Sequence, residues 1–130
     1  MWAYSSARES VRRLVALATL SEKAFLSDPD ACAIAERHLQ IAIQSVIDIG
    51  NHVVADLDLG VPTDYKGIVA LLAKHRIVSK PLANKLAAMA GMRNVLVHDY
   101  LDVDLPLVHR TLRHDLRDVE RFMAAVLKLV

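Results

Sequence analysis

Between about Ala31 and Asp58, apolar residues recur without interruption at spacings of three and four. One series is Leu39, Ala42, Val46, Ile49 and Val53, and a second is Ile43, Ile47, Gly50, Val54 and Leu57. On a helix with 100° per residue, the two series cover an arc of ~160°, which is wider than contact with one neighbouring helix requires. The segment therefore predicts a central bundle helix with several neighbours, one of which could belong to a second subunit.

Turn and capping signals divide the rest of the chain into further helices, about five in all. We expect a first helix over about 6–25, ended by Ser27-Asp28-Pro29-Asp30, and a short helix over about 64–75 after the break at 59–63. Ser79 with Pro81 predicts a helix that runs to about His98 or Tyr100, and Asp104 with Pro106 predicts a last helix that continues to near the C-terminus. No segment alternates like a strand, so the sequence predicts an all-α, up-and-down helical bundle.

Composition narrows the class of protein. The 130 residues have a net charge of +1 and one cysteine, so we expect a single domain over 1–130 that needs no disulfide and has no cysteine-based zinc site. No apolar run reaches the roughly 18 residues that span a membrane, and the first residues lack the plan of a signal peptide. We therefore expect a cytoplasmic protein without a membrane partner.

Residues 93–100 have the pattern R-x-x-x-x-H-x-Y at the end of a predicted helix. The Arg93 guanidinium is a permanently charged fork of donors suited to phosphate oxygens, and His98 can exchange protons near neutral pH. Together they could cleave RNA without a metal: His98 would move the protons and Arg93 would stabilise the charge on the phosphorane. The alternative is structural, because Arg and His near a helix C-terminus also bind the last carbonyl groups.

Helix geometry constrains this pair. Residues five apart project ~140° away from each other, whereas Asn94 and His98, four apart, share a face. The site therefore requires Arg93 to bend towards His98, the helix to loosen near His98, or the two groups to meet across a dimer interface. Two copies of His98 in a two-fold dimer would supply both an acid and a base, which favours a homodimer.

Three further features have both a functional and a structural interpretation. The last predicted helix carries basic residues within an arc of ~80°, and Arg110 and Arg113 are the best candidates among them for binding RNA. The alternative is an ordinary solvated face, because three acidic residues nearby would neutralise part of its charge: Asp115, Asp118 and Glu120. Polar residues in the central segment could line a cleft or face solvent: Asp48, Asn51 and His52. Gly91 costs about 1 kcal/mol inside a helix, which close approach of another helix would explain.

Several segments in order resemble the HepT toxins of the HEPN superfamily. These are 36–44 (ERHLQIAIQ), 48–52 (DIGNH), 60–62 (GVP) and 89–94 (MAGMRN), together with the R-x-x-x-x-H-x-Y motif, and the resemblance runs from about residue 30 to 125. It implies a HEPN fold that dimerises, with Arg93 and His98 as the catalytic pair of a metal-independent ribonuclease and Asn94 as a helper. It implies no cofactor and no metal.

The resemblance also implies a partner and a control point. HepT toxins are paired with an MNT nucleotidyltransferase antitoxin, which can transfer AMP to the motif tyrosine, here Tyr100. The expected function is therefore a ribonuclease toxin that acts on tRNA or mRNA and is neutralised by its antitoxin. The alternative is a non-catalytic HEPN module that binds RNA or regulates the nucleotidyltransferase.

Overall fold

The computed structural model describes residues 2–98 and 103–129, without the side chains of residues 94, 95, 97 and 98. These ranges contain seven helices and no strand. The helices are α1 (Trp2–Ala18), α2 (Glu22–Leu26), α3 (Pro29–Asp56), α4 (Tyr65–Lys74), α5 (Lys80–His98), α6 (Leu105–His114) and α7 (Leu116–Leu127). The predicted all-α fold is confirmed.

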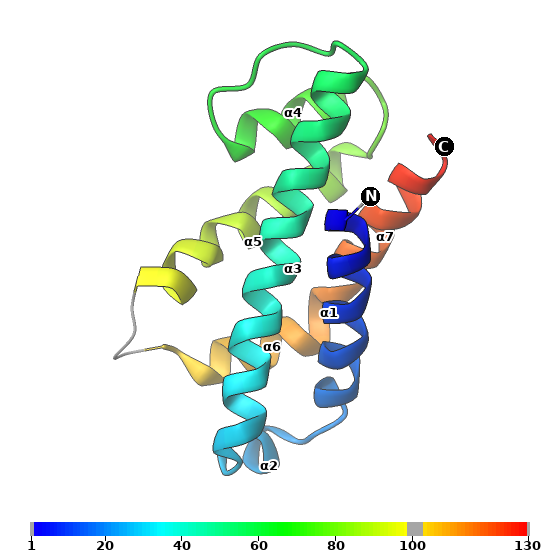
Figure 1. Ribbon diagram of the computed structural model, residues 1–130. Coiled ribbons are helices and arrows are strands. Elements are labelled where there is room, and N and C mark those ends of the chain that lie inside the picture. Colours follow the sequence, from blue (N-terminus) through cyan, green and yellow to red (C-terminus); the bar gives the residue numbers. More distant parts are fainter. Residues whose placement is uncertain (1, 99–102, 130) are drawn as a thin grey trace.

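The central helix lies where the sequence predicts it. α3 runs along the whole molecule, with α1 on one side and α5 on the other (Figure 1), and it also contacts α2, α4, α6 and α7. All five residues of the first apolar series are buried. The prediction for the second series holds except at its last residue, because Leu57 is the C-cap of α3 and remains 47% exposed. The wide apolar arc therefore reflects packing against many helices of the same chain.

The predicted first helix over 6–25 is wrong in one respect, because it is two helices. α1 ends at Ala18, and α2 begins after Ser21, whose hydroxyl accepts a hydrogen bond from the Ala24 N–H at 3.1 Å. A serine N-cap starts a new helix because it satisfies a backbone donor that lacks a partner in the first turn. The break between α1 and α2 allows Phe25 to become fully buried.

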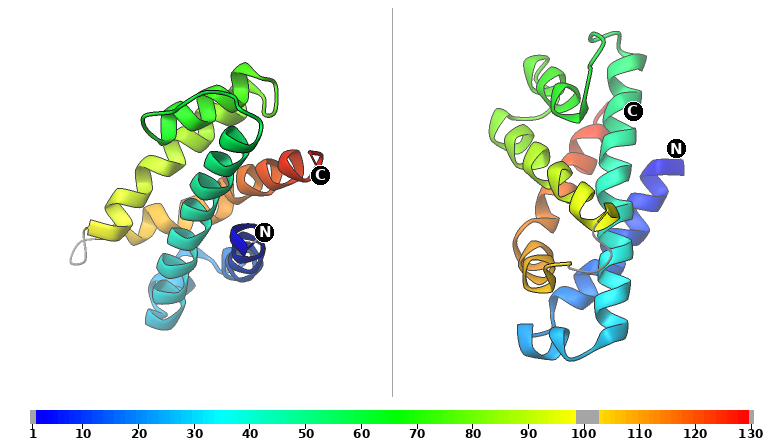
Figure 2. Two further views of the ribbon diagram at one scale, coloured as in Figure 1. Left: turned by 45° about the horizontal axis from the view of Figure 1, so that its top comes forward. Right: turned by 90° about the vertical axis from the view of Figure 1, so that its left-hand side faces the viewer.

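The predicted last helix is also two helices. Its start is confirmed, because the Asp104 carboxylate accepts from the Leu107 N–H at 3.1 Å. The helix breaks at Asp115, and α7 takes a different direction from α6 (Figure 2). At the junction the Asp115 N–H still bonds the Thr111 carbonyl, while the Asp118 N–H bonds the Asp115 carbonyl at 3.0 Å. The basic residues of this region therefore do not form one continuous helical face.

Candidate functional site

α5 carries the described part of the R-x-x-x-x-H-x-Y motif. As predicted, the helix begins after Ser79, whose hydroxyl accepts from the Leu82 N–H at 3.2 Å, and its backbone is helical through His98. Regular helix geometry therefore applies from Arg93 to His98, so the helix does not loosen before His98. Two of the three ways to bring the pair together remain: reach of the Arg93 side chain, or contact with a second subunit.

Arg93 is half-buried at the C-terminal end of α5. For Asn94 and His98, the structure describes the backbone position in α5, where their spacing of four places them on one face. Tyr100 lies outside the described residues. The catalytic roles of Arg93 and His98, the helper role of Asn94 and the modification of Tyr100 stay predictions.

A cavity of about 440 Å³ lies beside α5, directly before the motif. Its walls include Gly91 and Met92 of α5, the two residues that precede Arg93, and Leu107 and Thr111 of α6. A methyl group added at Gly91 would meet only the Tyr65 hydroxyl, at 3.8 Å, which is ordinary contact. Packing within the described protomer thus does not explain the glycine, and a neighbouring subunit stays a prediction.

The two candidate RNA-binding arginines differ in their surroundings. Both are exposed on α6, but the Arg113 guanidinium donates to the Leu20 carbonyl at 3.4 Å, between α1 and α2. The same carbonyl lies 2.8 Å from Nε2 of His109, a buried residue whose ring packs against Phe25 at 5.3 Å. Sequence reasoning missed this contact, because nothing in the sequence links residue 20 to residues 109 and 113. The RNA-binding role of Arg110 and Arg113 stays a prediction.

Arg117 and Arg121 of α7 are exposed, as expected for a solvated helical face. Asp118, which we expected to neutralise charge at the surface, is 1% exposed and lies 3.7 Å from Arg121 and 4.0 Å from Lys85 of α5. Asp118 thus lies close enough to Arg121 to neutralise part of its charge, as expected, but it is buried beside α5 rather than solvated.

The polar residues of α3 that could line a cleft are exposed in the protomer: Asp48, Asn51 and His52. Asp48 accepts a hydrogen bond from the Gln44 amide at 2.9 Å, one helical turn earlier. In the single protomer that the structure describes, these three side chains therefore face outwards. A role of these residues in a dimer cleft stays a prediction.

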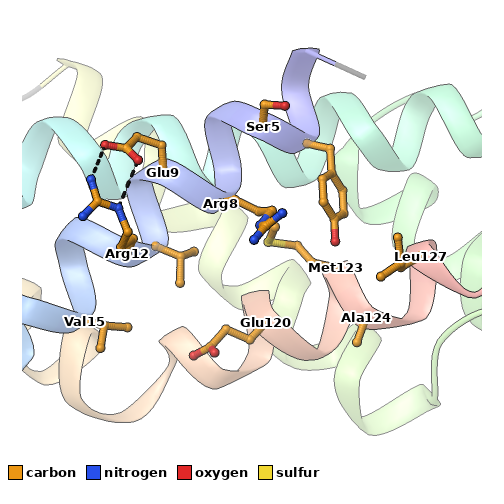
Figure 3. A pocket seen from close by; sticks show the side chains of 11 residues that line it. Ser5, Arg8, Glu9, Arg12, Val15, Glu120, Met123, Ala124 and Leu127 are labelled. Atoms are coloured by element: carbon orange, nitrogen blue, oxygen red, sulfur yellow. Dashed lines mark hydrogen bonds and ion pairs between the residues drawn. The ribbon is translucent and has the colours of Figure 1, made fainter.

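A second and larger hollow, of about 680 Å³, lies between α1 and α7. Arg8 and Glu120 face it from opposite helices, while Glu9 binds Arg12 at its edge (Figure 3). Hydrogen bonds from Arg12 and Arg13 lower the pKa of Glu9 to about 2. α1, which lines this hollow, lies on the other side of α3 from α5 (Figure 1), and the hollow shares no lining residue with the cavity beside α5, so it is separate from the candidate site.

No helix in 2–98 or 103–129 is long and apolar enough to cross a membrane. In the same ranges, no three His, Cys, Asp or Glu side chains are grouped so that they could hold a metal ion.

Comparison with known proteins identifies the family. The sequence model of the family described as ribonuclease HepT-like matches residues 7–126, which is almost the entire chain. The chain belongs to the HepT-like ribonuclease family. The resemblance inferred from residues 30–125 is therefore confirmed, and the match extends through α2 into α1.

Two relatives in this family are named as nucleases. The mRNA nuclease HepT of Shewanella oneidensis is 35% identical over 89 residues, which are 68% of this chain and 67% of that protein. The tRNA nuclease HepT of Aphanizomenon flos-aquae is 37% identical over 81 residues, 62% of this chain and 54% of that protein. The chain thus matches about half to two thirds of the length of these relatives.

Solved structures agree on the HEPN fold. A tri-AMPylated Shewanella oneidensis HEPN toxin in complex with MNT antitoxin has a TM-score of 0.85 at 28% identity, covering 98% of this chain and 95% of that chain. The cytosolic protein YutE of Bacillus subtilis has a TM-score of 0.81 at 17% identity, covering 97% and 87%, and supports the fold alone. The HepT-like fold thus extends over essentially all of this chain.

Proposed function

We propose that this protein is the toxin of a HEPN/MNT toxin–antitoxin pair and cleaves RNA without a metal ion. The observation that carries the proposal is the match of the HepT-like family to residues 7–126, combined with the R-x-x-x-x-H-x-Y motif at the end of α5. The relatives named as mRNA and tRNA nucleases support RNA as the substrate.

The proposed reaction is an internal transesterification. His98 of one protomer removes the proton from a ribose 2′-hydroxyl, the 2′-oxygen attacks the adjacent phosphorus, and the bond to the 5′-oxygen breaks. His98 of the second protomer gives a proton to the leaving 5′-oxygen. Arg93 stabilises the negative charge on the phosphorane. The products are a 2′,3′-cyclic phosphate and a 5′-hydroxyl.

A homodimer is part of this proposal for two reasons. One histidine cannot be both base and acid in the same step, and a two-fold axis near the end of α5 would bring two copies together. Asn94 shares the helical face of His98 and would help to hold the substrate or the imidazole. Arg110 and Arg113 on α6 would contact the RNA backbone, with Arg110 the freer of the two because Arg113 also binds Leu20.

Cleavage of total RNA in excess chelator tests the proposal. Purified wild-type protein and His98→Ala are compared, and the ends of the products are identified. We expect cyclic phosphate ends from the wild type, and at least a hundredfold less product from His98→Ala, about the contribution of one general acid or base. Equal cleavage by both proteins would reject His98 as catalytic, and no cleavage by either would favour the non-catalytic HEPN module.

Control by the antitoxin is the second part of the proposal. The MNT nucleotidyltransferase would transfer AMP from ATP to the Tyr100 hydroxyl, with release of pyrophosphate. The added phosphate brings bulk and negative charge two residues from His98, where an RNA phosphate would bind. The complex of a tri-AMPylated HEPN toxin with its MNT antitoxin supports this mechanism by similarity.

Intact-mass measurement after co-expression with the antitoxin tests the modification. We expect one or more AMP adducts on the wild type and none on Tyr100→Phe, together with loss of RNA cleavage by the modified protein. An unmodified wild-type protein that is still neutralised would show that the antitoxin acts by binding alone.

A further inference from the structure

Asp118 is a buried charge without a hydrogen bond. It is 1% exposed, and neither carboxylate oxygen has a hydrogen-bond partner among the described residues. An unsatisfied polar group in the interior costs free energy, so such a group needs a physical explanation. The proposed cleavage reaction does not use Asp118, which lies on α7.

Local geometry explains why the oxygens lack a partner. Asp118 is in the first turn of α7, where an acidic side chain at the third position commonly accepts from the N–H of the N-cap residue. Here the N-cap residue is Asp115, and its N–H is already bonded to the Thr111 carbonyl of α6 at 2.9 Å. The junction between α6 and α7 thus leaves the carboxylate without its usual backbone donor, although the N-terminus of α7 still favours a negative charge.

The nearest charges come from two helices. Arg121 is on α7 itself, with Nη1 at 3.7 Å, whereas Lys85 is on α5, with Nζ at 4.0 Å. Both cations are more than half exposed, so each keeps contact with water while the carboxylate does not. The interaction with Lys85 is therefore the one that links Asp118 to a second helix.

Lys85 is on the helix that carries the motif. It precedes Arg93 by eight residues, about 12 Å along α5, and it lines the same cavity as Gly91 and Met92. Apolar contacts between α5 and its neighbours are non-directional, so they leave the helix free to slide or rotate slightly. A buried carboxylate and a cation on the neighbouring helix attract most strongly at one relative position of the two helices, and fixing register is the best-supported use of buried ionic groups.

We infer that Asp118 is a positioning residue for the ribonuclease site: through Lys85 it fixes the register of α5 on α7 and hence the placement of Arg93 and His98. This inference rests on the proposed function. The inference predicts that stability and activity respond differently to the same substitution. Replacing the buried carboxylate by an apolar group removes the cost of burying a charge that has no hydrogen bond, so stability should not fall. Misplacing a catalytic group by about 1 Å, in contrast, can lower the rate by about a hundredfold.

The variants Asp118→Leu, Lys85→Met and the double variant test the inference. We expect the double variant to unfold at or above the wild-type temperature, with kcat lower by about tenfold or more and KM within about twofold. Lys85→Arg keeps the cation and should retain wild-type kcat. Glu120→Gln is the matched control, because it removes an exposed carboxylate two residues away on the same helix, and it should leave all values unchanged.

Hydrogen exchange provides a measurement that does not depend on cleavage. Backbone amides over 86–97 of α5 should exchange at least about tenfold faster in the double variant than in the wild type, while those of α3 should not change. If Asp118→Leu fails to fold, Asp118→Asn replaces it. The inference would be overturned if the folded double variant exchanged its amides over 86–97 as slowly as the wild type, or if it kept the wild-type kcat. An inactive wild type would reject the proposed function instead, and exchange would still decide whether Asp118 fixes α5.

Discussion

Protonation of His38 should affect the stability of the folded protein. Its Nδ1 atom lies 3.0 Å from the hydroxyl of Ser10, which is buried between α1 and α3. Burial lowers the pKa of His38 below its usual 6.5, and the nearby charges of Arg13 and Arg37 lower it further, while Glu9 opposes them. The folded protein therefore binds a proton at this site less readily than the unfolded chain does.

The sign of the pH dependence follows from linkage. Because the pKa of His38 is lower in the folded state, its contribution to stability is fully present above pH 6.5 and is lost as the pH falls from there through the lowered pKa. When the pH is lowered from 7.5 to 5.5, we expect the unfolding temperature of the wild type to decrease, and that of His38→Gln to decrease less. Thermal unfolding followed by circular dichroism at several pH values measures this. Equal slopes for both proteins would assign the pH dependence to other groups.

At the scale of the helices, sequence predicted most starts and missed two breaks. The caps at Ser79 and Asp104 carry their information in one residue and the following turn, so both were predictable. Ser21 carried the same kind of signal, but it was not recognised as a cap, so one continuous helix through Phe25 was predicted. The break at Asp115 has no glycine or proline, and Asp115 makes no side-chain cap. It depends on packing between α6, α7 and their neighbours, which the local sequence does not specify.

Two helical glycines should respond in opposite ways to the same substitution. A methyl group at Gly50 of α3 would lie 2.8 Å from Cγ2 of Ile68, a stiff, buried side chain of α4, whereas the nearest atom at Gly91 is at 3.8 Å. Gly50→Ala should lower the free energy of unfolding by about 1–2 kcal/mol, because overpacking exceeds the gain in helix propensity. Gly91→Ala should raise it by about 0.5–1 kcal/mol.

Urea unfolding of both variants at a concentration where the protein is monomeric measures these changes. A second measurement concerns the dimer. If another subunit packs closely on Gly91, Gly91→Ala will weaken dimerisation in sedimentation experiments while stabilising the protomer. A stabilised protomer with unchanged dimerisation would remove Gly91 from the interface, and destabilisation by Gly91→Ala would contradict the prediction that α5 accepts a methyl group at this position.

At the scale of the whole molecule, the fold was more predictable than the site. The period of the apolar residues in α3 specifies a central helix, and the family resemblance specifies how the others surround it. Contacts distant in sequence, such as Asp118 with Lys85 and His109 with Leu20, are not revealed by any pattern within one helix. In the proposed mechanism the site also requires a second subunit, because one His98 cannot be both base and acid in the same step.

The two-histidine mechanism makes a quantitative prediction for mixed dimers. If one cleavage event needs His98 from both protomers, a dimer of wild type and His98→Ala is inactive. After subunit exchange with a ninefold excess of His98→Ala, about one tenth of the wild-type protomers pair with each other, so activity per wild-type chain should fall about tenfold. Differently tagged chains that co-purify verify the exchange. Should activity per wild-type chain stay constant although mixed dimers form, each protomer would cleave RNA with its own His98, and the second proton would have to come from another group.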